Sequence, residues 1–309
     1  MKKQKTKFTE LVIIFAVILF LCSSCGKNIE NSPTSSGNIQ SSEIFTEAPN
    51  ESVVIGTIGD VSSSVSSERT SSQTASYSDS DLNSLDNTKR GWGPGICRNG
   101  NRSSAAVSYN NKYGKYNAVF IGEDTKNIYL TFDEGYENGY TAPILDTLKE
   151  KDVCAVFFVT YDYVKRNPEL VKRMIDEGHI VGNHSYSHPS FPSLSVEKAR
   201  DEILKLHDYV LDNFNYEMKL FRFPMGESSD RMLALVNSLN YKSVFWSFAY
   251  ADWTTTAQPE KSYALNHIVD SAHNGCIYLL HAVSKTNTEV LGEAIDKIRA
   301  NGYVFTKFE

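Results

Sequence analysis

Several features that mark common classes of protein are missing from this chain of 309 residues. Setting aside Cys22 and Cys25 near the amino terminus leaves Cys97, Cys154 and Cys276, with no Cys-x-x-Cys spacing among them. An odd number without paired spacing predicts neither a zinc knuckle nor a disulfide framework. The formal net charge is -6 and the chain has no basic stripe, which argues against nucleic acid as a partner. No protein partner is predicted.

The first 25 residues have the layout of an export signal, with four lysines ahead of an apolar run over 11–21. This run is short for a membrane span. The small residues before Cys25 resemble a bacterial lipoprotein cleavage box, in which this cysteine would become lipidated. Because Cys22 stands where such boxes usually have leucine, an uncleaved membrane anchor is the alternative. Both predict a protein exported to the outer face of the cytoplasmic membrane or to the cell wall.

Residues 26–88 have a different composition from the rest of the chain. Serine, threonine, asparagine and acidic residues dominate, and single hydrophobic residues are scattered without a period. Such a segment buries too little apolar surface to offset the cost of ordering, so we predict a disordered tether. Residues 89–309 are aromatic, apolar and periodic, and their number suits one large domain.

Short apolar strands alternate with helical patterns through this domain. Strands are predicted over 128–132, 155–159, 180–182, 220–223, 243–247, 276–280 and 303–306. Helices are predicted over 141–150, 168–177, 195–214, 228–239, 262–273 and 288–300. The alternation predicts an α/β fold with about seven parallel strands, in a distorted, incomplete (β/α) barrel. An open doubly wound sheet is the alternative, although no phosphate-binding glycine fingerprint follows the first strand.

Ionisable residues gather at the carboxyl ends of the predicted strands, where barrel enzymes carry their active sites. They are Asp133 and Glu134 after the first strand, His184 and His188 after the third, Arg222 at the fourth, Asp252 with Trp253 after the fifth, and His281 at the sixth. We therefore expect these side chains to face one site. Two histidines and a carboxylate suit a divalent metal with room for water.

Each of these residues also has a purely structural interpretation. His184 and His188, four residues apart, are compatible with a solvated loop. Arg222 is compatible with a buried ion pair, which would also keep a neighbouring Asp133 ionised. His281 fits a core histidine satisfied by the backbone, and Trp253 fits a packing role.

The motifs, taken together, resemble those of the polysaccharide deacetylases, the NodB-homology family of carbohydrate esterases. The matching segments are Thr131-Phe132-Asp133-Glu134-Gly135, His184-x-x-x-His188, Arg222-x-Pro224-x-Gly226, Asp252-Trp253 and Leu279-Leu280-His281. Residues 136–141 and the leading Trp92-Gly93 pair are most similar to the muramic acid deacetylases that prepare δ-lactam in spore cortex peptidoglycan.

The resemblance implies a role for each motif residue in removing acetyl groups from N-acetylated glycans. Asp133 corresponds to the catalytic base, and Arg222 tunes it. Asp252 orients His281, which protonates the leaving amine. The second acid and the motif histidines bind a divalent metal, expected to be zinc; they correspond to Glu134, His184 and His188.

Two positions depart from the family pattern. Glu134 replaces the usual aspartate, which moves the carboxylate one methylene further out and affects metal distance, affinity or identity. Met225 stands where many relatives have tyrosine, which changes the pocket wall but keeps a backbone N–H for an oxyanion.

The substrate remains open from the sequence. N-acetylmuramic acid in a peptidoglycan strand is the first expectation, with Tyr136, Tyr140, Tyr186 and Trp253 as candidate sugar-stacking side chains. The alternatives are a deacetylase for N-acetylglucosamine in peptidoglycan or chitin-like oligomers, an O-acetyl esterase, and a glycan-binding relative without catalysis, because discrimination lies in the loops around the pocket.

Overall fold

The predicted alternation of strands and helices is confirmed by a computed structural model, which describes residues 77–308. The strands are β1 (Arg90–Gly91), β2 (Ala118–Val119), β3 (Asn127–Glu134), β4 (Val156–Val159), β5 (Ile180–Asn183), β6 (Leu220–Phe221), β7 (Glu227–Ser228), β8 (Lys242–Val244), β9 (Ile277–His281) and β10 (Val304–Phe305). The helices are α1 (Asp79–Ser84), α2 (Ser104–Tyr113), α3 (Thr141–Glu150), α4 (Tyr161–Arg166), α5 (Pro168–Asp176), α6 (Val196–Phe214), α7 (Asp230–Ser238), α8 (Lys261–Asp270) and α9 (Lys285–Ala300). Three short 3₁₀ turns are η1 (Gly114–Tyr116), η2 (Phe191–Ser193) and η3 (Pro224–Gly226).

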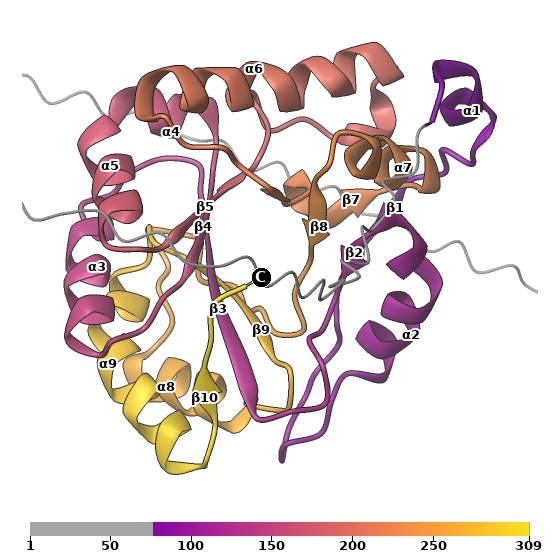
Figure 1. Cartoon of the computed structure of the whole chain (residues 1–309). Helices are drawn as coiled ribbons and strands as arrows, with labels where there is room; N and C mark the ends of the chain where they lie inside the picture. Colours follow the sequence, from indigo (N-terminus) through magenta and orange to yellow (C-terminus); the bar gives the residue numbers. More distant parts are fainter. Residues whose placement is uncertain (1–76, 309) are drawn as a thin grey trace, which may run out of the picture. The chain divides into compact units, whose positions relative to one another are not determined.

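Eight of the strands form one parallel sheet that curls around its own axis. The order is β10-β3-β4-β5-β6-β8-β2, and β9 also pairs with β3. A further parallel bridge joins Phe248, beyond β8, to Tyr278 of β9, so the sheet turns back toward its own beginning. Helices lie around the outside of the strands (Figure 1). This arrangement confirms the incomplete barrel rather than the open doubly wound sheet.

Local signals in the sequence explain where several elements begin and end. Ser195 precedes α6, and its hydroxyl accepts a hydrogen bond from the N–H of Lys198. Gly178 and Gly302 follow α5 and α9 with φ of 83°, a left-handed conformation that glycine adopts without a steric penalty. These signals end the helices just before β5 and β10.

The folded part starts earlier than the sequence indicated. Helix α1 lies within the segment predicted as tether, and its Leu82 is completely buried against the core. β1 pairs antiparallel with β7, which joins this amino-terminal segment to the loop after β6. The tether prediction for 26–88 is therefore wrong at its carboxyl end. A short polar helix with one anchoring leucine has too little hydrophobic periodicity to be recognised in a serine-rich segment.

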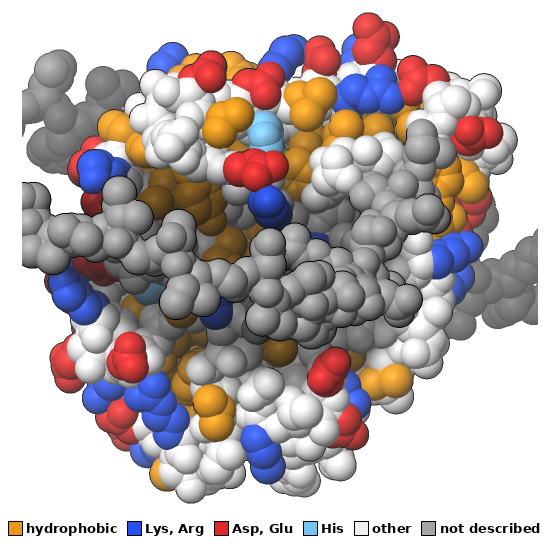
Figure 2. Space-filling model, in the orientation of Figure 1, with side chains coloured by type: hydrophobic (Ala, Val, Ile, Leu, Met, Phe, Trp, Pro, Cys, Tyr) orange, Lys and Arg blue, Asp and Glu red, His pale blue; other side chains and the backbone are white. Residues whose placement is uncertain are grey.

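The export signal and Cys25 lie outside the described residues. Within residues 77–308, no helix is both long and apolar enough to cross a membrane. Around the edge of the face shown in Figure 2, acidic and basic side chains are interspersed with hydrophobic ones.

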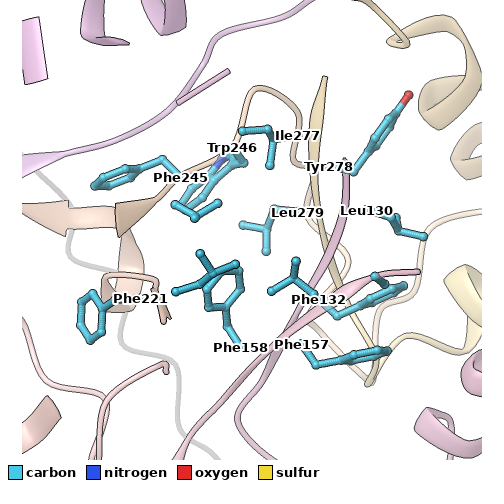
Figure 3. Close-up of a cluster of buried hydrophobic side chains, with 14 of the residues drawn as sticks. Leu130, Phe132, Phe157, Phe158, Phe221, Phe245, Trp246, Ile277, Tyr278 and Leu279 are labelled. Atoms are coloured by element: carbon cyan, nitrogen blue, oxygen red, sulfur yellow. The ribbon is translucent and has the colours of Figure 1, made fainter. Parts of the chain in front are cut away.

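The core covers both faces of the curled sheet, one inside the curl and one beneath the surrounding helices, with aromatic and aliphatic side chains from several strands. Figure 3 labels Leu130, Phe132, Phe157, Phe158, Phe221, Phe245, Trp246, Ile277, Tyr278 and Leu279. The rings of Phe132 and Phe157 stack at 5.2 Å, and those of Phe120 and Phe245 at 4.1 Å. Burying one such side chain contributes about 1.5–3 kcal/mol. This packing makes the strand ends a rigid platform.

We predict that Leu82→Ala lowers the free energy of unfolding by about 2–5 kcal/mol, because it leaves a cavity between α1 and the rest of the domain. Urea unfolding followed by circular dichroism measures the change. Leu211→Ala, on the exposed face of α6, is the control and should alter stability by less than about 0.5 kcal/mol. Equal effects of the two substitutions would show that α1 is not part of the cooperative unit.

Candidate active site

Asp133, near the end of β3, is the point where the charged groups converge. Its Oδ1 accepts a hydrogen bond from Nη1 of Arg222 at 2.9 Å, and its Oδ2 lies 3.5 Å from Nε2 of His184. Burial by itself would raise the pKa of Asp133. The charges of Arg222, His184 and His281 outweigh burial and hold the pKa below its ordinary value of 3.8. Asp133 is therefore an anion, buried but poised to accept a proton.

Arg222 follows β6, and its completely buried guanidinium is satisfied from several strands. Nε donates to the carbonyl of Val244 at 3.0 Å, and Nη2 donates to the carbonyl of Phe245 at 3.1 Å. Nη1 donates to Thr131 Oγ1 at 2.7 Å as well as to Asp133. The group also lies 4.2 Å from the ring centre of Phe158. These contacts fix the guanidinium plane against Asp133.

His184 and His188 bring two imidazoles together after β5, with ring centres 4.8 Å apart. Nδ1 of His184 lies 2.9 Å from the carbonyl oxygen of Arg222, which assigns the proton to Nδ1 and leaves a lone pair on Nε2. Burial lowers the pKa of His184 to about 4, so its imidazole is neutral at physiological pH. Two such nitrogen donors fit a divalent metal ion.

Glu134 is not brought into this pair. Successive strand residues point to opposite faces, and Asp133 faces Arg222. The Glu134 carboxyl is completely buried, neither of its oxygens has a hydrogen-bond partner, and its charged neighbours include Glu137. Burial, followed by the charges of Glu137 and Asp133, raises its pKa well above 4.5. Across 77–308 no three His, Cys, Asp or Glu side chains are arranged as a metal centre, so metal ligation by Glu134 remains a prediction.

His281 ends β9 on the other side of Asp133 and is paired with Asp252. Its Nδ1 donates to Asp252 Oδ1 at 2.7 Å, and its backbone N–H donates to Asp252 Oδ2 at 2.9 Å. Burial would lower the pKa of His281, but the hydrogen bond and charge of Asp252, with the charge of Asp133, raise it above 6.5. Trp253 lies beside this imidazole, with ring centres 5.7 Å apart.

The loops that carry these groups contain three non-glycine residues in left-handed backbone conformations. They are Ser185 with φ of 70°, His188 with 59° and Met225 with 57°. The backbone N–H of His188 donates to Ser185 Oγ, and that of Ser185 donates to Asn183 Oδ1, both at 2.9 Å. Such conformations persist only where the surroundings impose them, and they cluster at functional sites.

The four predicted sugar-stacking residues differ in their surroundings. Trp253 and Tyr136 are 54% and 50% exposed. Met225, which was expected in the pocket wall, is similarly exposed at 55%. Tyr140 is half-buried at the start of α3. Tyr186 stacks on Tyr161 with ring centres 4.2 Å apart.

Three residues that support the site were not singled out from the sequence. Thr131 bridges Arg222 and the carbonyl of Tyr278. Asn183 caps the turn that presents the histidines, as described above. Asn287, in α9, donates to Asp252. Short polar residues of this kind carry no motif signal, because their partners are distant in the sequence.

Comparison with known proteins relates this chain to a family of enzymes. Residues 121–244 match the family described as polysaccharide deacetylase. The peptidoglycan-N-acetylmuramic acid deacetylase PdaA of Bacillus subtilis is 41% identical over 71% of this chain and 84% of its own length. A solved structure of PdaA superposes with a TM-score of 0.69, covering 72% of this chain and 96% of that one.

Two further relatives are similar over shorter or less closely superposed regions. A family 4 carbohydrate esterase from Bacillus anthracis has a TM-score of 0.60 and 42% identity, covering 72% of this chain and 95% of its own. A peptidoglycan-N-acetylglucosamine deacetylase of Bacillus cereus is 31% identical over 60% of this chain and 66% of its own length.

The fold and the ionisable cluster together define a barrel hydrolase equipped for acid–base chemistry. The chain belongs to the polysaccharide deacetylase family, as its motifs indicated. Enzymes of this family are generally metal-dependent.

We predict that Arg222→Leu destabilises the domain by about 3–5 kcal/mol at pH 7, because it leaves Asp133 buried without its charge partner. The depressed pKa of Asp133 contributes stability that is present above 3.8 and is lost as the pH falls through the folded-state pKa. Without Arg222 the pKa of Asp133 rises. The difference in free energy of unfolding between the parent and Arg222→Leu should therefore become smaller as the pH falls toward and below 3.8.

Urea unfolding at several pH values measures this difference. Arg166→Leu, which removes an exposed ion pair with Asp162, is the control and should cost at most about 1 kcal/mol. If Arg222→Leu lowers the free energy of unfolding no more than the control does, or by an amount that does not change with pH, the ion pair between Arg222 and Asp133 is not a stabilising interaction.

Proposed function

We propose that the protein is a metal-dependent N-deacetylase of peptidoglycan that removes acetyl groups from N-acetylmuramic acid, as in δ-lactam formation. The observation that carries this proposal is the pairing of two oppositely tuned groups around one site. Against the effect of burial, Arg222 lowers the pKa of Asp133 and Asp252 raises the pKa of His281. Amide hydrolysis needs both a base and an acid, because an unprotonated amine leaves very poorly.

Asp133 acts as the base that removes a proton from the attacking water. Its depressed pKa keeps it unprotonated at neutral pH, and Arg222 holds the carboxylate in one orientation through Oδ1. Oδ2, on the side of His184, is the oxygen available to the water.

His281 acts as the acid that protonates the leaving nitrogen. Asp252 binds Nδ1, so the proton on Nε2 is the one available for transfer. The raised pKa of His281 means that the imidazolium form is present near neutral pH. Such a proton transfer is typically worth about a hundred- to ten-thousand-fold in rate.

His184 and His188 would hold the divalent metal, with zinc as the expected ion. When bound, the metal would polarise the acetyl carbonyl and lower the pKa of water. The backbone N–H of Met225 is our candidate for an additional oxyanion donor, since the strained turn of η3 lies directly after Arg222.

The substrate assignment is supported by the degree of similarity to relatives. The chain is 41% identical to the Bacillus subtilis muramic acid deacetylase and 31% identical to the Bacillus cereus glucosamine deacetylase. Exposed Trp253 offers an apolar surface for a sugar ring beside His281, and Tyr136, exposed three residues after Asp133, is a further candidate. Tyr140 and Tyr186 remain candidates for the same role.

We also propose that the enzyme is exported and acts on the cell wall from the outer face of the membrane, with lipidated Cys25 as its anchor. A peptidoglycan substrate requires export, and the amino-terminal segment has the layout that export uses. Metabolic labelling with a palmitate analogue tests the anchor; Cys25→Ala should abolish labelling.

We predict that Asp133→Asn and His281→Ala each reduce acetyl release by at least about a hundredfold while the domain stays folded. Acetate release measures the effect, and circular dichroism checks the fold. Asp162→Asn, at an exposed position in α4 outside the site, serves as the control and should retain activity. Activity at the control level in either site variant, with an intact fold, would overturn the assigned roles.

We predict that the enzyme releases acetyl from muramic acid in peptidoglycan glycan strands that lack stem peptides, and that a chelator abolishes this release. Mass spectrometry of glycan fragments measures it, with peptide-bearing strands and chitin oligomers run beside them. Loss of acetyl from glucosamine units alone would replace the muramic acid assignment with a general peptidoglycan deacetylase. No release from any glycan would instead favour a glycan-binding protein.

A further inference from the structure

We infer that Asn287, held by Tyr250, is a positioning residue that fixes the Asp252 carboxylate and through it the His281 imidazole. This inference rests on the proposed function, in which His281 is the acid. Asn287 lies in the first turn of α9, outside every motif that the sequence indicated.

Asp252 is completely buried, so its oxygens depend on donors supplied by the protein. His281 supplies two of them, one from the ring and one from the backbone, as described above. Asn287 supplies the third, from Nδ2 to Asp252 Oδ2 at 2.5 Å. Both His281 contacts come from one residue. Among residues 77–308, the contact from α9 is therefore the one that ties the carboxylate to a separate element. Asn287 therefore limits rotation of the carboxylate about its own side chain.

The orientation of the Asn287 amide is itself determined by its neighbours. The hydroxyl of Tyr250 donates to Asn287 Oδ1, which leaves Nδ2 on the side of Asp252. Nδ2 also approaches the carbonyl of His281 at 3.4 Å, and the backbone N–H donates to Ser284 Oγ at 3.1 Å. Tyr250 and Asn287 are both buried. Consecutive hydrogen bonds thus connect Tyr250, Asn287, Asp252 and His281.

The choice of an amide has an electrostatic consequence. Three charged groups already act on the His281 imidazole: Asp252 after β8, Asp133 of β3 and Arg222 after β6. His188, after β5, also interacts electrostatically with His281. An amide donates to Asp252 without adding a charge to this set. A carboxylate at position 287 would instead repel Asp252 when ionised, and would replace the missing donor only when protonated.

The test compares variants of the full chain. Asn287→Leu keeps the shape of the side chain and removes the donor. We expect kcat to fall about tenfold to a hundredfold, the scale of one hydrogen bond to a charged group, with KM nearly unchanged. Tyr250→Phe, which removes only the support for the amide, should lower kcat about two- to tenfold. Thr288→Val is the control in the same helical turn; it removes a bond to the Ser284 carbonyl and should have no effect on kcat.

Two further readouts separate positioning from a purely structural role. In Asn287→Leu, the proton NMR resonance of His281 Nδ1–H should move upfield and exchange faster with water, because the carboxylate is no longer held. Asn287→Asp should approach parental activity at low pH, where the introduced carboxyl is protonated and donates to Asp252, and should lose activity relative to the parent as the pH rises.

The outcomes distinguish this inference from the proposed function. If the parent enzyme releases no acetyl from any glycan, the proposed function fails, while the NMR resonance still tests the contact. If the parent is active and Asn287→Leu shows parental kcat with an unchanged resonance, the inference is overturned. If Asn287→Leu does not fold, the other two variants test the inference. The inference is overturned if Tyr250→Phe has the kcat of the parent and Asn287→Asp has the pH profile of the parent.

Discussion

The buried ion pair between Arg222 and Asp133 is the interaction on which the rest of the site depends. A guanidinium that is completely removed from water is costly unless it is paired and hydrogen-bonded. Here its donors reach the carbonyls of Val244 and Phe245, the hydroxyl of Thr131 and the Asp133 carboxylate. The pair therefore joins β3, the end of β6 and the segment after β8 at one point. The curled sheet is what brings these strand ends close enough to share one side chain.

Arg222 organises the part of the site that contains Asp133 and His184. The side chain of Arg222 lowers the pKa of Asp133, while its backbone carbonyl orients His184 so that Nε2 is free. On the far side of Asp133, the buried Asp252 raises the pKa of His281. Two groups a short distance apart are thus driven in opposite directions, one toward the anion and the other toward the cation. This separation lets a single site accept one proton and donate another near neutral pH.

The amino-terminal segment contributes more to the domain than its composition suggests. Helix α1 buries Leu82. β1 pairs with β7, the strand that directly follows the turn of η3. Trp92 follows β1; its backbone N–H donates to the carbonyl of Gly226, and its indole N–H donates to the carbonyl of Trp246. A Cβ on Gly226 would lie 2.8 Å from the Trp246 ring. The loop beside the site is therefore shaped by a segment distant in the sequence.

The sequence alone determined seven of the eight strands of the parallel sheet, six of the helices and the incomplete barrel, because hydrophobic period and helix caps are local properties. It did not indicate β2 or α2. It also placed Asp133, His184 and His281 at strand ends, since motifs are contiguous. Only the tertiary structure decided that the Glu134 carboxyl is buried without a hydrogen-bond partner, that Asn287 reaches Asp252, and that α1 belongs to the domain. Those outcomes depend on which side chains meet across the sheet, and packing between segments distant in the chain leaves no local pattern to read.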